Sequence, residues 1–268
     1  MATILDEINA HKRKEIEANS SRISVNELKL SPFFKRETNS LKASLKRSTK
    51  GGIIAEFKTR SPSKGLINGS AEVTIVTSGY ARAGVAGISV LTDNLYFGGS
   101  FENLAKARRA NPLMPVLRKD FMLEPYQIYE AKAHGADVIL LIAASLEKKK
   151  LAEMAQLAKD LGLEVLFEIY TEEELQRLPD HVDVVGVNNR NLKTFEVAIE
   201  NSVRLGKLLP ESMIRVSESG LSSVDDLLYL KKQGFHGFLM GESFMRSEEP
   251  GMACEGLIRE FLIKQRQS

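Results

Sequence analysis

The 268-residue sequence contains one cysteine, Cys254, and four histidines at positions 11, 134, 181 and 236. A single cysteine excludes a disulfide within the chain, and histidines so scattered give no zinc-type cluster, so we expect no metal site. An excess of one charge is also absent, because 37 Lys and Arg residues are matched by 35 Asp and Glu residues. This balance gives no reason to expect nucleic acid or an anionic membrane as the main partner.

Long hydrophobic runs are missing as well. No apolar run approaches the roughly 20 residues needed to span a bilayer. Acidic and basic side chains between Asp6 and Glu17 interrupt the region where a signal or transit peptide would lie. We therefore expect a cytoplasmic protein. Hydrophobic residues make up 43% and charged residues 27%, which excludes a disordered chain, a collagen and a coiled-coil rod.

The first 50 residues have a basic excess, with 11 Lys or Arg against 6 Asp or Glu. Apolar residues from Ile4 to Ile16 follow helical spacing, and a Ser-x-x-Glu capping box at Ser24 begins a second helix. Residues 40–50 predict a third helix, ended by a Gly-Gly pair. We expect these 50 residues to form a helical extension that packs on a barrel formed by residues 51–268, one domain in all.

From residue 52 onward, eight short apolar or β-branched runs alternate with helical stretches. Their starts lie about 26 residues apart on average, the length of one strand, one helix and two loops. Residues 138–142, Val-Ile-Leu-Leu-Ile, are apolar throughout, as a strand buried on both faces of a parallel sheet requires. The predicted strands are 53–57, 87–92, 115–119, 137–142, 164–169, 184–188, 214–217 and 237–240.

Eight β-α units predict an α/β fold, a (β/α)₈ TIM barrel with an N-terminal helical extension. The alternative is an open doubly wound sheet that binds a nucleotide. The sequence contains no G-x-G-x-x-G fingerprint and no G-x-x-x-x-G-K-[ST] phosphate loop, so the barrel is favoured.

Charged and amide side chains stand at the ends of several predicted strands, where a barrel carries its active site. Taken singly, each has an ordinary interpretation as a solvated lysine, a carboxylate near a helix start or a turn residue. Together, lysines and glutamates of opposite charge can meet at one mouth of the barrel. These residues are Glu56 and Lys58, Lys119, Glu168, Asn188 with Arg190, and Glu218.

Glycines follow the last two strands at Ser219-Gly220 and Gly241. Barrels frequently bind phosphate at this place through backbone N–H groups and a helix N-terminus. The pattern indicates a phosphate-bearing small molecule.

These motifs resemble those of the indole-3-glycerol phosphate synthase family, and the resemblance covers nearly the whole chain. It implies a carboxy-lyase of tryptophan biosynthesis that converts 1-(2-carboxyphenylamino)-1-deoxyribulose 5-phosphate to indole-3-glycerol phosphate, releasing carbon dioxide and water. No organic cofactor or metal is implied. The matching segments occur in order: Ile54-Ala55-Glu56-Phe57-Lys58, Ser61-Pro62-Ser63-Lys64-Gly65, Tyr96-Phe97-Gly98-Gly99-Ser100, Lys119-Asp120-Phe121, Glu168, Gly186-Val187-Asn188-Asn189-Arg190, Glu218-Ser219-Gly220 and Gly241.

The resemblance also implies catalytic roles. Lys119 matches the acid that protonates the ketone oxygen when the ring carbon attacks it. Lys58 matches a residue that grips the carboxylate and is a candidate acid for dehydration, and Glu168 matches the acid–base residue near the anilino nitrogen. Glu56 matches a residue that positions the lysines and the substrate hydroxyls. The division of proton transfers between Lys58 and Glu168 stays open.

The remaining matches concern substrate binding. Asn188 matches a catalytic group that orients the substrate, and Arg190 matches a second orienting group that could also steady Glu56. Phe121 and Leu239 are expected to line the pocket for the aromatic ring. The phosphate and the rest of the substrate are expected at Ser61, Glu218, Ser219, Gly220 and Gly241.

Two positions depart from the family pattern. Thr59 stands where Lys or Arg is frequent, and we expect little effect from it. Glu242 stands where a small Ser is common, and we expect its side chain to face away from the phosphate. The basic extension either helps to capture the anionic substrate or is a solvated helix face.

Two rival functions fit the sequence less well. Phosphoribosylanthranilate isomerase resembles this chain in architecture but needs a cysteine at the end of the first strand, where this sequence has Glu56-Phe57-Lys58. A non-catalytic barrel that binds a phosphate ligand is the other alternative, but it would usually have lost a catalytic lysine or glutamate. We expect a phosphorylated small molecule as partner, no nucleic acid or membrane, and a monomer or weak homo-oligomer.

Overall fold

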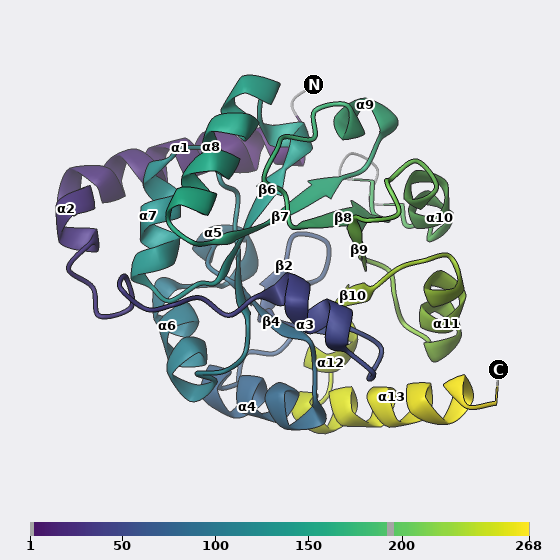
Figure 1. Cartoon of the computed structure of the whole chain (residues 1–268). Coiled ribbons are helices and arrows are strands. Elements are labelled where there is room, and N and C mark those ends of the chain that lie inside the picture. Colours follow the sequence, from purple (N-terminus) through teal and green to yellow (C-terminus); the bar gives the residue numbers. More distant parts are fainter. Residues whose placement is uncertain (1–2, 192–195, 268) are drawn as a thin grey trace.

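Eight parallel strands close into a barrel in the computed structural model, which describes residues 3–191 and 196–267 (Figure 1). The first strand, β1 (Ile53–Phe57), pairs with both β4 (Gly87–Leu91) and β10 (Gly237–Met240), and this double pairing closes the sheet. The predicted TIM barrel is confirmed. The other barrel strands are β5 (Val116–Lys119), β6 (Val138–Ile142), β7 (Glu164–Ile169), β8 (Val184–Asn188) and β9 (Ile214–Glu218).

Helices follow the strands and cover the outside of the barrel (Figure 1). Short elements in the loops are the hairpin of β2 (Arg60–Ser61) and β3 (Gly65–Leu66), the helices α5 (Asn94–Phe97) and α12 (Glu242–Met245), and the 3₁₀ turn Ala143–Ser145. The outer helices are α4 (Val73–Ala83), α6 (Phe101–Ala110), α7 (Tyr126–Ala133), α8 (Lys148–Asp160), α9 (Glu172–Leu175), α10 (Glu200–Gly206), α11 (Val224–Lys232) and α13 (Pro250–Gln265).

Three helices precede the barrel: α1 (Ile4–Arg22), α2 (Val25–Leu28) and α3 (Leu41–Arg47). The third is shorter than the 40–50 predicted, because it ends at Arg47 and the chain then turns toward β1. Gly52 makes this turn at φ +75°, and a Cβ there would lie 2.1 Å from the carbonyl oxygen of His236. A side chain at this position would therefore collide with the last strand.

The helix α3 closes one end of the barrel and lies across it in Figure 1. Its Leu41 and Leu45 belong to the same buried cluster as the side chains inside the barrel. A Cβ on Gly237 of β10 would lie 2.5 Å from Leu45 Cδ2. Leu45 thus packs directly against the strand backbone, and α3 supplies the floor of the barrel.

Asp137 holds the segment before α3 at the same end, just ahead of β6. Its carboxylate accepts hydrogen bonds from Arg36 Nη2 at 2.7 Å, the backbone N–H of Asn39 at 2.8 Å and Arg108 Nη1 at 2.6 Å. Because Asp137 is fully buried, the loss of any of these partners would weaken the compensation of its charge.

No helix within residues 3–191 and 196–267 is long and apolar enough to cross a membrane. Among the same residues, no group of three or more His, Cys, Asp or Glu side chains is placed to hold a metal ion.

Candidate active site

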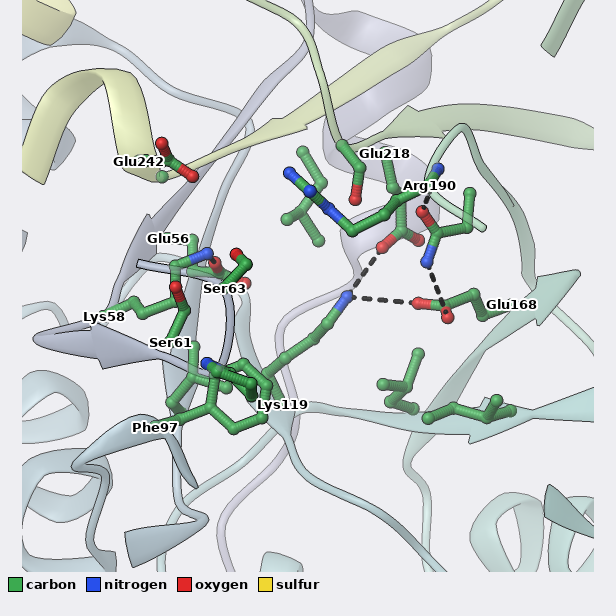
Figure 2. Close-up of a pocket in the computed structure, with 18 of the residues that line it drawn as sticks. Glu56, Lys58, Ser61, Ser63, Phe97, Lys119, Glu168, Arg190, Glu218 and Glu242 are labelled. Atoms are coloured by element: carbon green, nitrogen blue, oxygen red, sulfur yellow. Dashed lines mark hydrogen bonds and ion pairs between the residues drawn. The ribbon is translucent and has the colours of Figure 1, made fainter. Parts of the chain in front are cut away.

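One pocket opens at the carboxyl ends of the barrel strands, opposite α3 (Figure 2). Strands of one parallel barrel place their final residues around the same mouth, so residues far apart in the sequence meet there. Every site residue predicted from the sequence lines this pocket: Glu56, Lys58, Ser61, Lys119, Phe121, Glu168, Asn188, Arg190, Glu218, Ser219, Gly220, Leu239 and Gly241.

Lys119, the last residue of β5, lies at the centre of the pocket. Its ammonium Nζ is 2.6 Å from Glu218 Oε2 and 3.4 Å from Glu168 Oε2 (Figure 2). The side chain is 15% exposed, so the ammonium reaches the pocket while its stem is covered. Two carboxylates from β7 and β9 thereby hold one proton donor that faces the cavity.

Burial and neighbouring charges have opposite effects on the pKa values of Lys119 and Glu218. Burial alone would lower the pKa of Lys119, but Glu218 and Glu168 outweigh it, so the pKa lies above its usual value and the lysine stays charged. Burial raises the pKa of Glu218 to about 7; Lys119 acts against this rise and Glu168 adds to it. Glu218 therefore titrates near neutral pH.

Asn188, at the end of β8, positions Glu168. Its Nδ2 donates to Glu168 Oε1 at 3.1 Å, and its Oδ1 accepts from the backbone N–H of Arg190 at 2.9 Å. The backbone carbonyl of Asn188 accepts from Asn201 Nδ2 at 2.9 Å. The amide is thus fixed from both sides, and it leaves one oxygen of Glu168 to Lys119.

A second ion pair lies on the β1 side of the pocket, where Glu56 Oε1 is 2.6 Å from Lys58 Nζ (Figure 2). Burial would raise the pKa of Glu56, but Lys58 and Lys119 lower it below its usual range. Gly241 makes room for this carboxylate, because a Cβ there would lie 2.8 Å from the Cβ of Glu56. The sequence suggested only a phosphate-binding role for Gly241.

The turn after β9 adopts an unusual backbone. Ser219 has φ +69° and Gly220 has φ +72°, a region that a non-glycine residue rarely adopts. Asn189 Nδ2 donates to the Ser219 carbonyl at 3.1 Å, which helps to hold the turn. Strain of this kind often accompanies a ligand-binding site.

Three further polar groups lie at the rim of the pocket. The Ser61 hydroxyl is buried and has no hydrogen-bond partner among the described residues. The Arg190 side chain extends across the pocket near Glu218 (Figure 2). The Glu242 carboxylate lines the same pocket but forms an ion pair with Arg246, one turn further along the chain.

The opposite wall of the pocket is apolar. Phe97 and Phe121 lie with ring centroids 6.0 Å apart, and Leu140, Ile142 and Leu239 continue the surface. A ring could lie here beside Lys119.

Part of the pocket lining was not expected from the sequence. Ile4, Leu5 and Ile8 of α1 contribute to the pocket, as does Phe97. Their helical spacing predicted an apolar helix face, but not the surface that this face covers. The Tyr96-to-Ser100 motif was the available signal for Phe97.

Solved structures with this architecture share the fold alone. 3-Hexulose-6-phosphate synthase from Salmonella typhimurium aligns with a TM-score of 0.61 at 12% identity, covering 81% of this chain and 99% of that one. The tryptophan synthase alpha subunit from Legionella pneumophila aligns with a TM-score of 0.61 at 10% identity, covering 87% and 100%.

Sequence comparisons are more specific. Curated indole-3-glycerol phosphate synthases from Bacteroides thetaiotaomicron and Salinibacter ruber are each 44% identical, over 261 and 260 residues. The alignments cover 97% and 96% of this chain and 99% and 96% of the relatives. The family model "Indole-3-glycerol phosphate synthase" matches residues 5–257. The chain therefore belongs to the indole-3-glycerol phosphate synthase family.

Proposed function

We propose that Lys119 is the acid for ring closure in the family's reaction, which forms indole-3-glycerol phosphate from 1-(2-carboxyphenylamino)-1-deoxyribulose 5-phosphate. The observation that carries this proposal is the ammonium of Lys119, held between Glu218 and Glu168 and facing the cavity. When the ring carbon attacks the ketone carbon, a carbon–carbon bond forms and the carbonyl electrons move to oxygen. A proton from Lys119 neutralises that oxygen.

Lys58 and Glu56 serve the carboxylate side of the substrate in this proposal. The ammonium of Lys58 offers a positive charge to the carboxylate that later leaves as carbon dioxide, and its ion pair with Glu56 holds it in position. Loss of carbon dioxide returns the bonding electrons to the ring.

Dehydration needs one acid and one base, because the new hydroxyl leaves with a proton while the neighbouring carbon loses one. We assign the base to Glu168, because Asn188 and Lys119 fix its two oxygens. We assign the acid to Lys58, which lies on the other side of the pocket (Figure 2). The product is then an aromatic indole.

The apolar wall and the polar side of the pocket bind different parts of the substrate. The aromatic ring lies against Phe97, Phe121 and Leu239, and Arg190 orients the polar chain. The phosphate lies near Ser61 and the glycines that follow β9 and β10. The strained turn at Ser219-Gly220 and the unpartnered Ser61 hydroxyl support this placement.

The test follows indole fluorescence after the substrate is added. The protein contains no tryptophan, so indole emission comes from product alone. We expect emission to rise with wild type and with Lys106→Ala, a change on the exposed face of α6, and to stay flat with Lys119→Ala. Activity of Lys119→Ala within tenfold of wild type would overturn the role of Lys119. A folded but inactive wild type would favour a non-catalytic phosphate-binding barrel.

We also propose that the protein works in the cytoplasm as a monomer or weak homo-oligomer. A doubly anionic substrate does not cross membranes unaided, which supports a location where the pathway's other intermediates are made. We further propose that residues 1–50 and the barrel form one cooperative domain. The sedimentation coefficient tests the oligomeric state. A single unfolding transition tests whether residues 1–50 and the barrel form one domain.

A further inference from the structure

Lys12 of α1 is a buried lysine outside the set of pocket residues. It is 1% exposed, and its Nζ lies 2.9 Å from Asp93 Oδ2 and 3.0 Å from Asp120 Oδ1. Both carboxylates are fully buried. Lysines are almost never buried unless they are paired. Its neighbours Arg13 and Lys14 on the same helix are exposed. Lys12 therefore differs from both in its burial.

The charge of Lys12 persists despite its burial. Burial would lower the pKa of Lys12, but Asp120 and Asp93 outweigh it and hold the pKa above its usual value. An uncharged residue here would leave two buried carboxylates without their shared cation, at a substantial cost.

Asp120 connects Lys12 to Phe121 of the apolar wall. It directly follows Lys119, and its Oδ1 also accepts the backbone N–H of Phe121 at 2.8 Å. Its Oδ2 accepts from Arg118 Nη2 at 3.0 Å and from the Thr92 hydroxyl. Asp120 therefore fixes the backbone of Phe121, an aromatic wall residue, directly after the proposed acid.

Asp93 connects Lys12 to Phe97 of the same wall. Its Oδ1 accepts the backbone N–H of Tyr96 at 2.8 Å and caps α5, which ends with Phe97. The Phe97 ring packs beside the Phe121 ring in the apolar wall. One ammonium thus joins the loop after β4 to the loop after β5, and each loop carries one ring of the pair.

We propose that Lys12 is a positioning residue, which sets the spacing of Phe97 and Phe121 and the place of Lys119 by bridging Asp93 and Asp120. This inference rests on the proposed roles of Lys119 and the aromatic wall. Lys12 does not line the pocket, so it acts through the two carboxylates and not through contact with substrate.

The experiment compares Lys12→Met with Arg36→Met. Arg36→Met breaks an ion pair that the N-terminal segment makes with the buried Asp137 at the opposite end of the barrel. We expect both variants to lose stability, because each leaves a buried carboxylate short of a partner. Below the unfolding temperature of each, we expect kcat/KM to fall by roughly tenfold to a hundredfold in Lys12→Met only. The fall includes a higher KM, because the aromatic wall has shifted.

Two further variants keep the test decisive if Lys12→Met does not fold. Lys12→Arg retains the charge and should recover part of the loss in kcat/KM. Lys12→Met/Asp93→Asn removes one of the stranded carboxylates; it should be more stable than Lys12→Met but still impaired, because the bridge is gone. Wild-type kcat and KM in this double variant, or equal effects of Lys12→Met and Arg36→Met, would overturn the inference. An inactive wild type would instead contradict the proposed function.

Discussion

The Glu218 carboxylate occupies the space that a side chain at Gly186 would fill. A Cβ on Gly186 would lie 2.0 Å from Glu218 Oε1. That oxygen is buried and has no hydrogen-bond partner among the described residues, while Oε2 bonds to Lys119. The glycine of β8 thus permits the position of a charged group on β9.

Gly186→Ala should therefore displace Glu218 and free Lys119 from its closer partner. We expect kcat to fall by about tenfold to a hundredfold, because a shift of the acid by about 1 Å is costly. Steady-state kinetics with the fluorescence assay measure this. The control is Gly256→Ala in α13, where a Cβ would meet nothing within 4 Å. The control should keep wild-type kcat, and a wild-type kcat for Gly186→Ala would contradict the prediction.

The raised pKa of Glu218 predicts a stability that depends on pH. With a pKa of about 7 in the folded protein against an ordinary 4.5, the native state binds this proton more tightly than the unfolded state. The resulting stabilisation is present in full below about pH 4.5 and is lost as the pH rises through 7.

Denaturant unfolding of wild type and Glu218→Gln from about pH 5 to pH 8 measures this effect. Each pH unit between the two pKa values changes the stability by about 1.4 kcal/mol. The stability of wild type relative to the glutamine variant should therefore fall as pH rises. A constant difference would mean that Glu218 does not titrate near neutral pH.

Lys58→Ala separates substrate binding from product binding. If Lys58 holds the carboxylate, the variant should bind substrate more weakly, by about tenfold for one lost charge-assisted bond. Its affinity for indole-3-glycerol phosphate should be unchanged, because the product no longer carries that carboxylate. The KM for substrate and the inhibition constant of the product give the two values. Equal losses of both affinities would argue for a general effect on the pocket.

Leu45→Ala tests the floor of the barrel. Leu45 is 2% exposed, and its removal should lower the free energy of unfolding by about 2–5 kcal/mol. The kcat and KM should not change, because the pocket lies at the other end. Leu208→Ala, at a side chain 50% exposed, should change stability by less than about 0.5 kcal/mol. A raised KM in Leu45→Ala would show that the two ends are coupled.

Glu242→Ser tests the departure from the family pattern. Because the carboxylate of Glu242 pairs with Arg246, its repulsion of the phosphate is already reduced. We expect KM to change by less than about twofold, in keeping with the small energy of an exposed ion pair. Strongly tighter substrate binding by the variant would show that the carboxylate faces the phosphate.

The barrel was predictable because its strands are buried on both faces, which demands apolar runs such as residues 138–142. The pocket residues were predictable because a parallel barrel brings strand ends together, so Glu56, Lys119 and Glu168 needed only their order in the chain. The predicted end of α3, at residue 50, was wrong because the helix ends at Arg47. The turn at Gly52 depends on contact with a strand far along the sequence.

The burial of Lys12 could not be predicted from the sequence. It stands beside Arg13 and Lys14 and looks like them, and its partners Asp93 and Asp120 are distant in sequence. The same holds for Ile4 and its apolar neighbours, whose helix was expected while its contact surface was not. Local pattern determines a helix face, but tertiary structure determines what covers it.

The floor formed by α3 has a consequence for the order of events during synthesis. The ribosome releases Leu41 and Leu45 early, yet Leu45 packs on Gly237 of the last strand. The strand β1 also needs β10, which is synthesised last, to close the barrel. Until nearly the whole chain has emerged, Leu45 lacks its contact with Gly237 and one edge of β1 is unpaired. Contacts so distant in sequence slow folding and prolong the exposure of apolar surface. A nascent chain of this protein should therefore depend on chaperones until its final strand leaves the exit tunnel.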